Sequence, residues 1–244
     1  MGIRSIIRAW IRPGRSALNS EEPFLVQKFL FAGEKDLVVF DVGAYVGNIT
    51  AAYVETFPQA MLYCFEPFPD SFKELRRLAD CKSIKPYQIA LSDRNGKAKL
   101  WVNTDRSCNS IFSRPIAGAK YYSESSRNIG QIEVKTQTLD TFCDTEDIAE
   151  IDILKLDVEG AELKVLNGAS RRLRDKRIKL IFTEVMFVPH YEGGCLLHEV
   201  LGFLSRYDYT LFNLYNLKRA RNGRLRWGNA IFLNPQMQSR IEST

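Results

Sequence analysis

The sequence contains no long apolar run and no paired-cysteine motif. No stretch approaches the roughly 18 uninterrupted apolar residues of a transmembrane helix, so we expect no membrane span. The five cysteines are odd in number, widely spaced and without a Cys-x-x-Cys pair, which argues against a disulfide framework and a metal cluster. We therefore expect free thiols and a cytoplasmic location.

Most of the chain also has little net charge. The formal charge is +5, but residues 1–20 contain four arginines and no acid. The remainder is nearly neutral, which argues against a nucleic-acid partner held by phosphate contacts.

The basic N-terminus has a helical pattern of its own. Residues 3–11 place isoleucines and Trp10 on one face of a helix and arginines largely on the other. We expect residues 1–36 to form an N-terminal helical extension. The apolar face either docks on the domain or lies on an anionic membrane, and the second alternative means peripheral membrane contact through residues 1–15.

Beyond this extension, strand-like and helical segments alternate along the chain. The strand-like runs are residues 37–41, 61–66, 87–91, 151–156, 178–184, 210–216 and 227–234. Helical stretches separate several of them, at 48–57, 161–174 and 196–205. This order predicts an α/β domain over residues 37–234, with a seven-stranded, mostly parallel, Rossmann-like sheet and helices on both faces. We expect residues 235–244 to form a C-terminal tail.

The middle of the chain interrupts this alternation. Around residues 96–137, two runs of alternating apolar and polar residues flank a long polar segment. The pattern predicts a small β insertion holding a long loop, which is either an active-site lid or a surface loop without a role.

A glycine-rich loop comes directly after the first strand. The sequence from Asp41 through Gly43, Ala44 and Gly47 to Asn48 leads from a buried strand into a helix. Gly43 permits a tight backbone turn, and the N–H groups near Gly47 and Asn48 favour a carboxylate or a phosphate. This pattern predicts a cofactor site, although such glycines also serve as simple turns.

Two nucleoside cofactors fit such a loop. Dinucleotide sites need a second glycine where this chain has Tyr45, whereas the Asp-x-Gly-x-x-x-Gly spacing is similar to that of class I S-adenosylmethionine (SAM) domains. Glu66 ends the second strand and can accept both ribose hydroxyls of SAM or NAD. Phe68 comes next, either against an adenine ring or in the core.

Acidic residues end four of the predicted strands: Asp41, Glu66, Asp157 and Glu184. Since the carboxyl ends of parallel strands share one edge of a sheet, we expect these carboxylates to line one crevice. The alternative for any single one, such as Asp157, is helix capping.

Over residues 37–234 the chain resembles the FkbM-type methyltransferases. The resemblance rests on Phe40-Asp-Val-Gly-Ala-Tyr-Val-Gly47, Phe65-Glu-Pro67, Ala90-Leu-Ser-Asp93 with Gly96, Asn109-Ser110, Thr138-Leu-Asp140, Ile153-Leu-Lys-Leu-Asp-Val-Glu-Gly-Ala-Glu162 and Val165-Leu-Asn-Gly168. It implies a class I methyltransferase fold, SAM as the cofactor, and methyl transfer to a hydroxyl, often on a sugar, a polysaccharide or a secondary metabolite. The expected cofactor-binding residues are Asp41, Gly43, Ala44, Gly47, Asn48, Glu66, Phe68, Ser92 and Asp93.

A hydroxyl acceptor needs help in losing its proton. We expect Asp157 or Glu159 to act as the base, with His190 as the next candidate. Asp157, Glu159 and Glu184 are also suited to a hard cation, but we expect no metal. The fourth strand end lacks the Asn/Asp-Pro-Pro-aromatic motif of nucleic-acid amino methyltransferases, which favours an oxygen acceptor.

The sequence therefore predicts a SAM-dependent O-methyltransferase. Its expected partner is a carbohydrate or glycolipid hydroxyl, with no nucleic acid, and its expected location is the cytoplasm or the membrane surface. An NAD-dependent oxidoreductase and a non-catalytic SAM-binding module are the alternatives.

Overall fold

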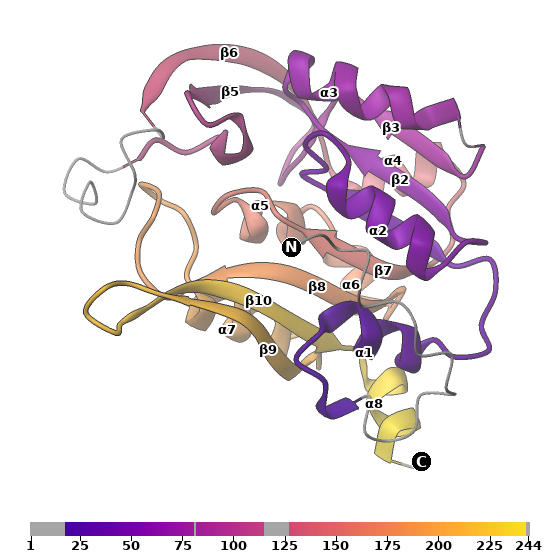
Figure 1. The fold of residues 1–244 in the computed structure, drawn as a ribbon. Helices are drawn as coiled ribbons and strands as arrows, with labels where there is room; N and C mark the ends of the chain where they lie inside the picture. The colour runs from indigo at the N-terminus through magenta and orange to yellow at the C-terminus, as the bar shows by residue number, and fades with distance from the viewer. Residues whose placement is uncertain (1–17, 81, 115–126, 243–244) are drawn as a thin grey trace.

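A seven-stranded sheet forms the centre of the molecule (Figure 1). The computed structural model describes residues 18–80, 82–114 and 127–242, so the predicted helix at 3–11 and the contact through 1–15 lie outside the described residues. Within the described ranges, no helix has the length and apolar character needed to cross a membrane. The cysteines described are Cys64, Cys108, Cys143 and Cys195, and all are free.

The strand order agrees with a class I methyltransferase fold. In spatial order the strands are β3 (Ile84–Tyr87), β2 (Met61–Phe65), β1 (Val38–Val42), β7 (Ile151–Leu156), β8 (Ile178–Met186), β10 (Leu225–Leu233) and β9 (Thr210–Arg219). The first five are parallel, and β10 runs antiparallel to both β8 and β9. The predicted mostly parallel sheet is confirmed.

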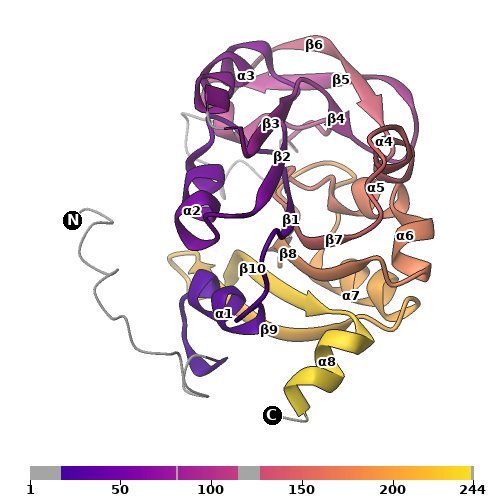
Figure 2. The same ribbon diagram turned by 90° about the vertical axis from the view of Figure 1, so that its right-hand side faces the viewer.

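Helices cover both faces of this sheet (Figure 2). One face carries α1 (Pro23–Leu30), α2 (Asn48–Thr56), α3 (Pro69–Arg76) with the 3₁₀ turn η3 (Arg77–Asp80), and α8 (Pro235–Glu242). The other face carries α4 (Leu139–Thr145), α5 (Glu162–Asn167), α6 (Ser170–Arg174) and α7 (Leu197–Ser205).

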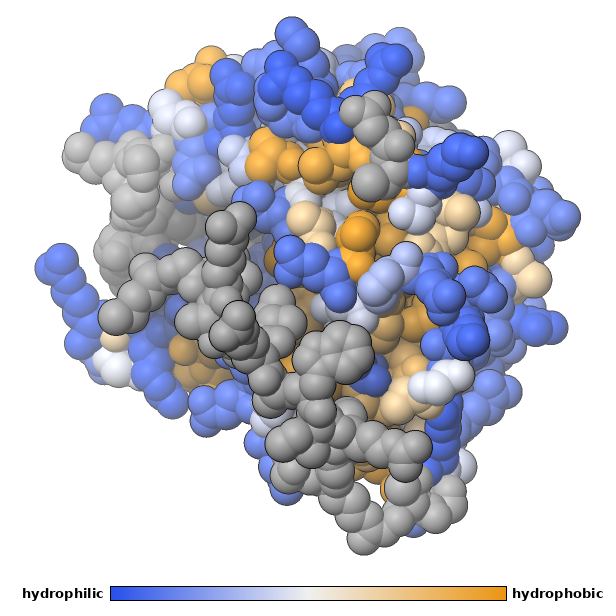
Figure 3. Space-filling model, turned by 45° about the vertical axis from the view of Figure 1, so that its right-hand side comes forward, coloured by the Kyte–Doolittle hydropathy of each residue, from blue (hydrophilic) through white to orange (hydrophobic). Residues whose placement is uncertain are grey.

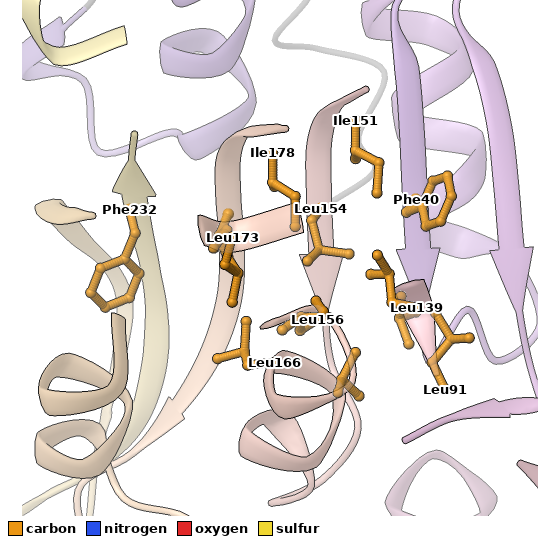
Figure 4. Close-up of a cluster of buried hydrophobic side chains, with 14 of the residues drawn as sticks. Phe40, Leu91, Leu139, Ile151, Leu154, Leu156, Leu166, Leu173, Ile178 and Phe232 are labelled. Atoms are coloured by element: carbon orange, nitrogen blue, oxygen red, sulfur yellow. The ribbon is translucent and has the colours of Figure 1, made fainter. Parts of the chain in front are cut away.

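Alternation along the strands builds two cores. Phe40 and Leu154 pack with the α4–α7 layer (Figure 4), whereas the preceding residues Val39 and Ile153 pack with the α1–α2 layer. All four are fully buried, because successive side chains of a strand point to opposite faces. Runs that are apolar at every position are typical of a parallel sheet covered on both sides.

The surface differs in character from these cores. On the face in Figure 3, hydrophilic residues form the rim and apolar residues gather toward the middle. The large apolar side chains described as exposed are Leu25, Ile129, Leu211 and Leu217. They are divided among α1, β6 (Asn128–Gln137) and β9.

The predicted insertion forms a second, three-stranded sheet. Its order is β4 (Ala90–Leu91), β6 and β5 (Gly96–Asn103), and the 3₁₀ turn η4 (Arg106–Cys108) comes after β5. Residues 115–126 of the predicted long loop lie outside the described part.

Three segment predictions need correction. The residues expected to form one strand at 87–91 belong to two strands. The pairing of β3 with β2 ends at Tyr87, whereas Ala90 pairs with Thr136 of β6. The helix expected at 161–174 divides after Asn167, where the carboxylate of Asp140 accepts the N–H groups that open α6. The strand expected to end at Glu184 continues to Met186. The C-terminal segment contains the helix α8.

The topology fixes where a site can form. From β1 the chain moves outward to β2 and β3, and then returns on the other side of β1 as β7. A crevice opens beyond the carboxyl ends of strands at such a switch point. The glycine loop after β1 and the acidic segment after β7 therefore meet there.

Candidate active site

The glycine loop packs directly against the end of β7. Gly43 has a φ of +78°, and a Cβ built on it would lie 1.8 Å from the carbonyl oxygen of Asp157. Gly47 has a φ of +92° and precedes α2, and its Cβ would lie 2.3 Å from a methyl carbon of Leu78. Gly43 is therefore required both by its conformation and by its close approach to the backbone of β7, whereas Gly47 is required mainly by its conformation.

A buried cation joins β1, the loop and β7. The Nζ of Lys155 lies 3.0 Å from Asp41, 3.5 Å from Asp157, and donates to the carbonyl of Gly43 at 3.2 Å. Asp41 is fully buried and also accepts the Thr50 hydroxyl at 2.7 Å. Burial alone would lower the pKa of Lys155, but the carboxylates of Asp41 and Asp157 raise it above its ordinary value.

These contacts indicate that Asp41 positions Lys155 and the start of α2. One of its oxygens lies beside the Nζ of Lys155, and the other accepts the Thr50 hydroxyl. Lys155 was absent from the predicted site, although it stands in the Lys-x-Asp-x-Glu motif. The parallel pairing of β1 with β7 places Asp41 beside Lys155.

Replacing Lys155 by methionine is expected to destabilise the fold by roughly 3–5 kcal/mol, because the carboxylate of Asp41 stays buried without its charge partner. Urea denaturation followed by circular dichroism measures the loss. The double variant Lys155→Met/Asp41→Asn should regain most of it, since no buried charge is left. A loss below about 1 kcal/mol in the single variant would show that the pair is not needed.

The first cavity, here called the narrow pocket, lies between the main sheet and the insertion. It is lined by Val42, Gly43, Tyr45, Phe65, Glu66, Pro67, Ile89, Ala90, Leu91, Leu100, Arg106, Ser107, Asn109, Ser110, Ile111, Asp157, Val158, Glu159 and Ala161. Glu66 accepts the N–H groups of Tyr45 at 3.0 Å and Phe68 at 2.8 Å. Burial raises the pKa of Glu66 to about 7, against the lowering effect of these hydrogen bonds.

Of the predicted cofactor residues, Gly43 and Glu66 belong to this lining, and the others lie outside it: Asp41, Ala44, Gly47, Asn48, Phe68, Ser92 and Asp93. Phe68 packs with Leu100 and other apolar residues of the insertion. Ser92 donates to Asp93, and Asp93 forms an ion pair with Lys164 of α5 at 3.0 Å. The apolar residues Ile89, Ala90 and Leu91, just before this pair, line the pocket instead.

The second cavity, here called the wide cavity, has a volume of about 760 Å³. It shares Gly43, Tyr45, Ser107, Asp157 and Glu159 with the narrow pocket, so the two adjoin at these residues. The predicted residues Ala44, Asn48 and His190 also line it. Sequence reasoning missed several further lining residues, which include Phe24, Arg114, Tyr191, Arg226 and Trp227.

Three carboxylates gather in the wide cavity. One oxygen each of Asp157, Glu159 and Glu184 lies within 4.8 Å of the others. Burial is the main cause that raises the pKa of Glu159 to about 8, and Asp157 raises it further. The pKa of Glu184 is also well above its usual range, through burial and then the neighbouring acids. The oxygen donors are of the kind that hold Mg²⁺ or Ca²⁺, and the same groups can accept a proton.

Glu159 is held from one side by a hydrogen-bond chain. Its Oε2 accepts the Tyr191 hydroxyl at 2.5 Å, and Arg114 donates to that hydroxyl at 3.0 Å. Glu159 also has a φ of +54°, which is uncommon for a residue other than glycine. The surroundings thus hold the side chain in one orientation at the junction of the cavities.

His190 lies in the same cavity in its neutral form. Its Nδ1 is 2.9 Å from the carbonyl of Val188, which can only accept, so this nitrogen carries the proton. Burial lowers the pKa of His190, and the charges of Arg226 and Arg114 lower it further. The Nε2 atom lies 3.5 Å from the guanidinium of Arg226 and is unprotonated.

Known proteins resemble this chain over most of its length. The family model of the methyltransferase FkbM domain matches residues 41–211. The 2-O-methyltransferase NoeI of Sinorhizobium fredii is 29% identical over 71% of this chain and 73% of its own. The 31-O-demethyl-FK506 methyltransferase FkbM of Streptomyces tacrolimicus is 28% identical, with the same coverage of both chains.

Two further matches are more distant. The hexuronic acid methyltransferase AglP of Haloferax volcanii is 27% identical over 66% of this chain and 61% of its own. The crystal structure of precorrin-6y C5,15-methyltransferase from Geobacter metallireducens is 11% identical, with a TM-score of 0.47, over 90% of this chain and 91% of that one.

The family match confirms the predicted family, the SAM cofactor and the predicted methyltransferase activity. The match favours SAM over NAD as the cofactor and excludes the alternative function of an NAD-dependent oxidoreductase. The chain belongs to the FkbM-type family of SAM-dependent methyltransferases.

Proposed function

We propose that this protein transfers the methyl group of SAM to a hydroxyl of a sugar in a glycan, a polysaccharide or a glycolipid. The observation that carries this proposal is that Asp157 and Glu159 line both cavities and therefore lie where they adjoin. The names of two relatives, a 2-O-methyltransferase and a hexuronic acid methyltransferase, support oxygen and a sugar as the acceptor.

We assign the adenosine part of SAM to the narrow pocket from the chemistry of its lining. Glu66 is the acceptor for the ribose hydroxyls, and Pro67, Ile89 and Leu91 offer apolar contact to the adenine ring. Because Gly43 has no Cβ, the turn after β1 can pack directly against the end of β7. The amino-acid end of SAM then lies along Ala44 and Asn48 in the wide cavity.

The chemistry needs one proton acceptor at the junction. SAM supplies a methyl group on a sulfonium, and transfer forms the O–C bond as the C–S bond breaks, leaving S-adenosylhomocysteine. Glu159 takes the hydroxyl proton, because its pKa of about 8 is close to the working pH of a general base. Asp157 lies beside it, and the Nε2 of His190 is the second candidate for the base.

Replacing Glu66 by alanine is expected to weaken SAM binding by about 10-fold to 100-fold, through loss of hydrogen bonds to a charged acceptor. The wild-type affinity should also fall as the pH drops below about 7, because protonation removes the carboxylate that binds the hydroxyls. Calorimetric titration measures both effects. Asp93→Asn is the control, since Asp93 pairs with Lys164 outside the pocket, and an equal loss there would contradict the assignment of Glu66.

We assign the catalytic domain to residues 37–234, the helical extension to 1–36 and the tail to 235–244. Part of the extension belongs to the site, because Glu22, Pro23 and Phe24 line the wide cavity. Phe24 also packs edge-on against Tyr53 of α2, with ring centroids 5.0 Å apart. The amphipathic pattern of residues 3–11 and the arginines beside it favour an acceptor at the membrane surface.

Methyl transfer to an acceptor tests the function directly. The purified protein is incubated with SAM and a panel of mono- and oligosaccharides, and release of S-adenosylhomocysteine is followed by mass spectrometry. We expect release with a sugar present, and one new methyl ether on the product. Binding of SAM without transfer to any acceptor would favour the non-catalytic module.

A further inference from the structure

The β9–β10 hairpin brings a run of cations to the wide cavity. Residues 217–226 contain no acid and five basic residues, which are Lys218, Arg219, Arg221, Arg224 and Arg226. Asn216, which precedes this run, and Trp227, which comes directly after it, both line the cavity. Figure 1 shows the hairpin projecting from the edge of the main sheet. The run is thus continuous with the site.

Arg226 is the cation of this run that lines the cavity itself. It is half-buried, and its backbone carbonyl accepts the N–H of Phe187 at 2.8 Å, which fixes it beside β8. Its guanidinium lies 3.5 Å from the Nε2 of His190. Because His190 is held neutral, its ring adds no second positive charge beside Arg226.

Both acidic and basic side chains line the wide cavity. Asp157 and Glu159 lie at the junction with the narrow pocket, where the acceptor hydroxyl has to meet the methyl group. Arg114, the other guanidinium of the cavity, is tied to Glu159 through Tyr191. Arg226 belongs to the hairpin, which the narrow pocket does not reach. An acceptor whose hydroxyl lies at the junction, and whose remainder fills the wide cavity, therefore meets Arg226 in its lining.

We propose that Arg226 and the hairpin cations form a subsite for an anionic group of the acceptor, either a carboxylate or a phosphate. This inference rests on the proposed function and narrows its acceptor to an acidic sugar. A guanidinium matches both anions with two parallel hydrogen bonds. The exposed side chains of Arg221 and Arg224 add a positive field that attracts a longer acidic chain.

Binding of matched probes tests the subsite. The protein is saturated with S-adenosylhomocysteine and titrated with methyl β-glucuronoside, glucose 6-phosphate and methyl β-glucoside, followed by NMR. We expect at least one anionic probe to bind about 10-fold to 100-fold more tightly than the neutral one, and the preferred probe distinguishes carboxylate from phosphate. Arg226→Gln should remove this preference, whereas Arg174→Gln on α6, an exposed arginine outside both cavities, should keep it.

Equal affinity for all three probes, or binding of none, would overturn the subsite. Thermal unfolding shows whether Arg226→Gln is folded, and Arg221→Gln/Arg224→Gln in the exposed turn provides a variant with little structural risk. This double variant should bind an oligogalacturonate more weakly and a maltooligosaccharide equally well. Loss of binding to phosphatidylglycerol vesicles with unchanged oligogalacturonate affinity would instead make the hairpin a membrane contact. Failure to bind S-adenosylhomocysteine would count against the proposed function, while the anion preference can still be measured without it.

Discussion

Replacing Gly43 by alanine is expected to abolish tight SAM binding and to lower the stability of the fold. The added Cβ would overlap the carbonyl oxygen of Asp157 at 1.8 Å, so the loop and β7 must separate. The φ of +78° adds a cost of about 1–2 kcal/mol for a residue with a side chain. With the cost of overpacking, we expect a total of roughly 2–5 kcal/mol in the free energy of unfolding.

The same displacement opens the narrow pocket, which Gly43 and Asp157 both line. We expect SAM affinity to fall by at least about 100-fold, which corresponds to ~2.7 kcal/mol of binding free energy. Denaturant unfolding and calorimetric titration measure the two effects separately. Gly33→Ala is the matched control, because Gly33 has a φ of +87° but a Cβ added there would meet no atom within 4 Å.

The control isolates the clash from the backbone strain. Gly33→Ala should cost only about 1–2 kcal/mol in stability and leave SAM binding unchanged. If the Gly43 and Gly33 variants behave alike, the close approach to Asp157 does not determine the site, and Gly43 is only a turn residue.

Local patterns are sufficient to predict the fold and the glycine loop. The loop is contiguous in sequence, and its strand, turn and helix follow from neighbouring residues between Val38 and Thr56. The acidic strand ends are expected to converge because parallel strands end at one edge. Glu66, Asp157 and Glu159 do line one pocket, whereas Asp41 is fully buried outside its lining and pairs with Lys155.

Contacts between distant segments are beyond such patterns. Nothing near Phe24 indicates that α1 reaches the wide cavity, since only the folded chain brings it beside α2. Asp93 stands at a suitable place in the motif, but its side chain turns to Lys164, 71 residues later. The basic sequence around Arg226 favours a solvated hairpin, and its place at the cavity depends on the antiparallel pairing of β10 with β8.

The second large effect is expected for Glu159→Gln, which should reduce kcat by about 100-fold to 10,000-fold. Glutamine has nearly the same shape and can still accept the Tyr191 hydroxyl, but it cannot take a proton from the acceptor. The affinity for SAM should stay within about twofold, because the neutral side chain keeps the pocket filled. Glu192→Gln, an exposed neighbour that accepts from Ser113, is the matched control and should keep full activity.

The pH dependence gives an independent readout of the same group. As a base, Glu159 acts in its ionised form, so wild-type kcat/KM should rise with pH and level off above about 8. Glu184 is close enough to titrate together with it, so the midpoint belongs to the pair. Glu159→Gln should remove or displace this rise, and an unchanged profile with nearly full kcat would transfer the role of base to His190 or Asp157.

Stability should respond to pH in the opposite direction from activity. The pKa of Glu159 in the folded state is raised to about 8, above the 4.5 expected for an exposed glutamate. Between these two values the folded state binds more protons than the unfolded state, so the free energy of unfolding falls as the pH rises. Glu159→Gln removes this contribution and should flatten the slope between about pH 5 and pH 8 in denaturant unfolding. A buried base at the junction of the two cavities should therefore lower the stability of the enzyme over the same pH interval in which it raises the activity. The ionised carboxylate is the active form, and it is costly to bury until it takes a proton from the acceptor.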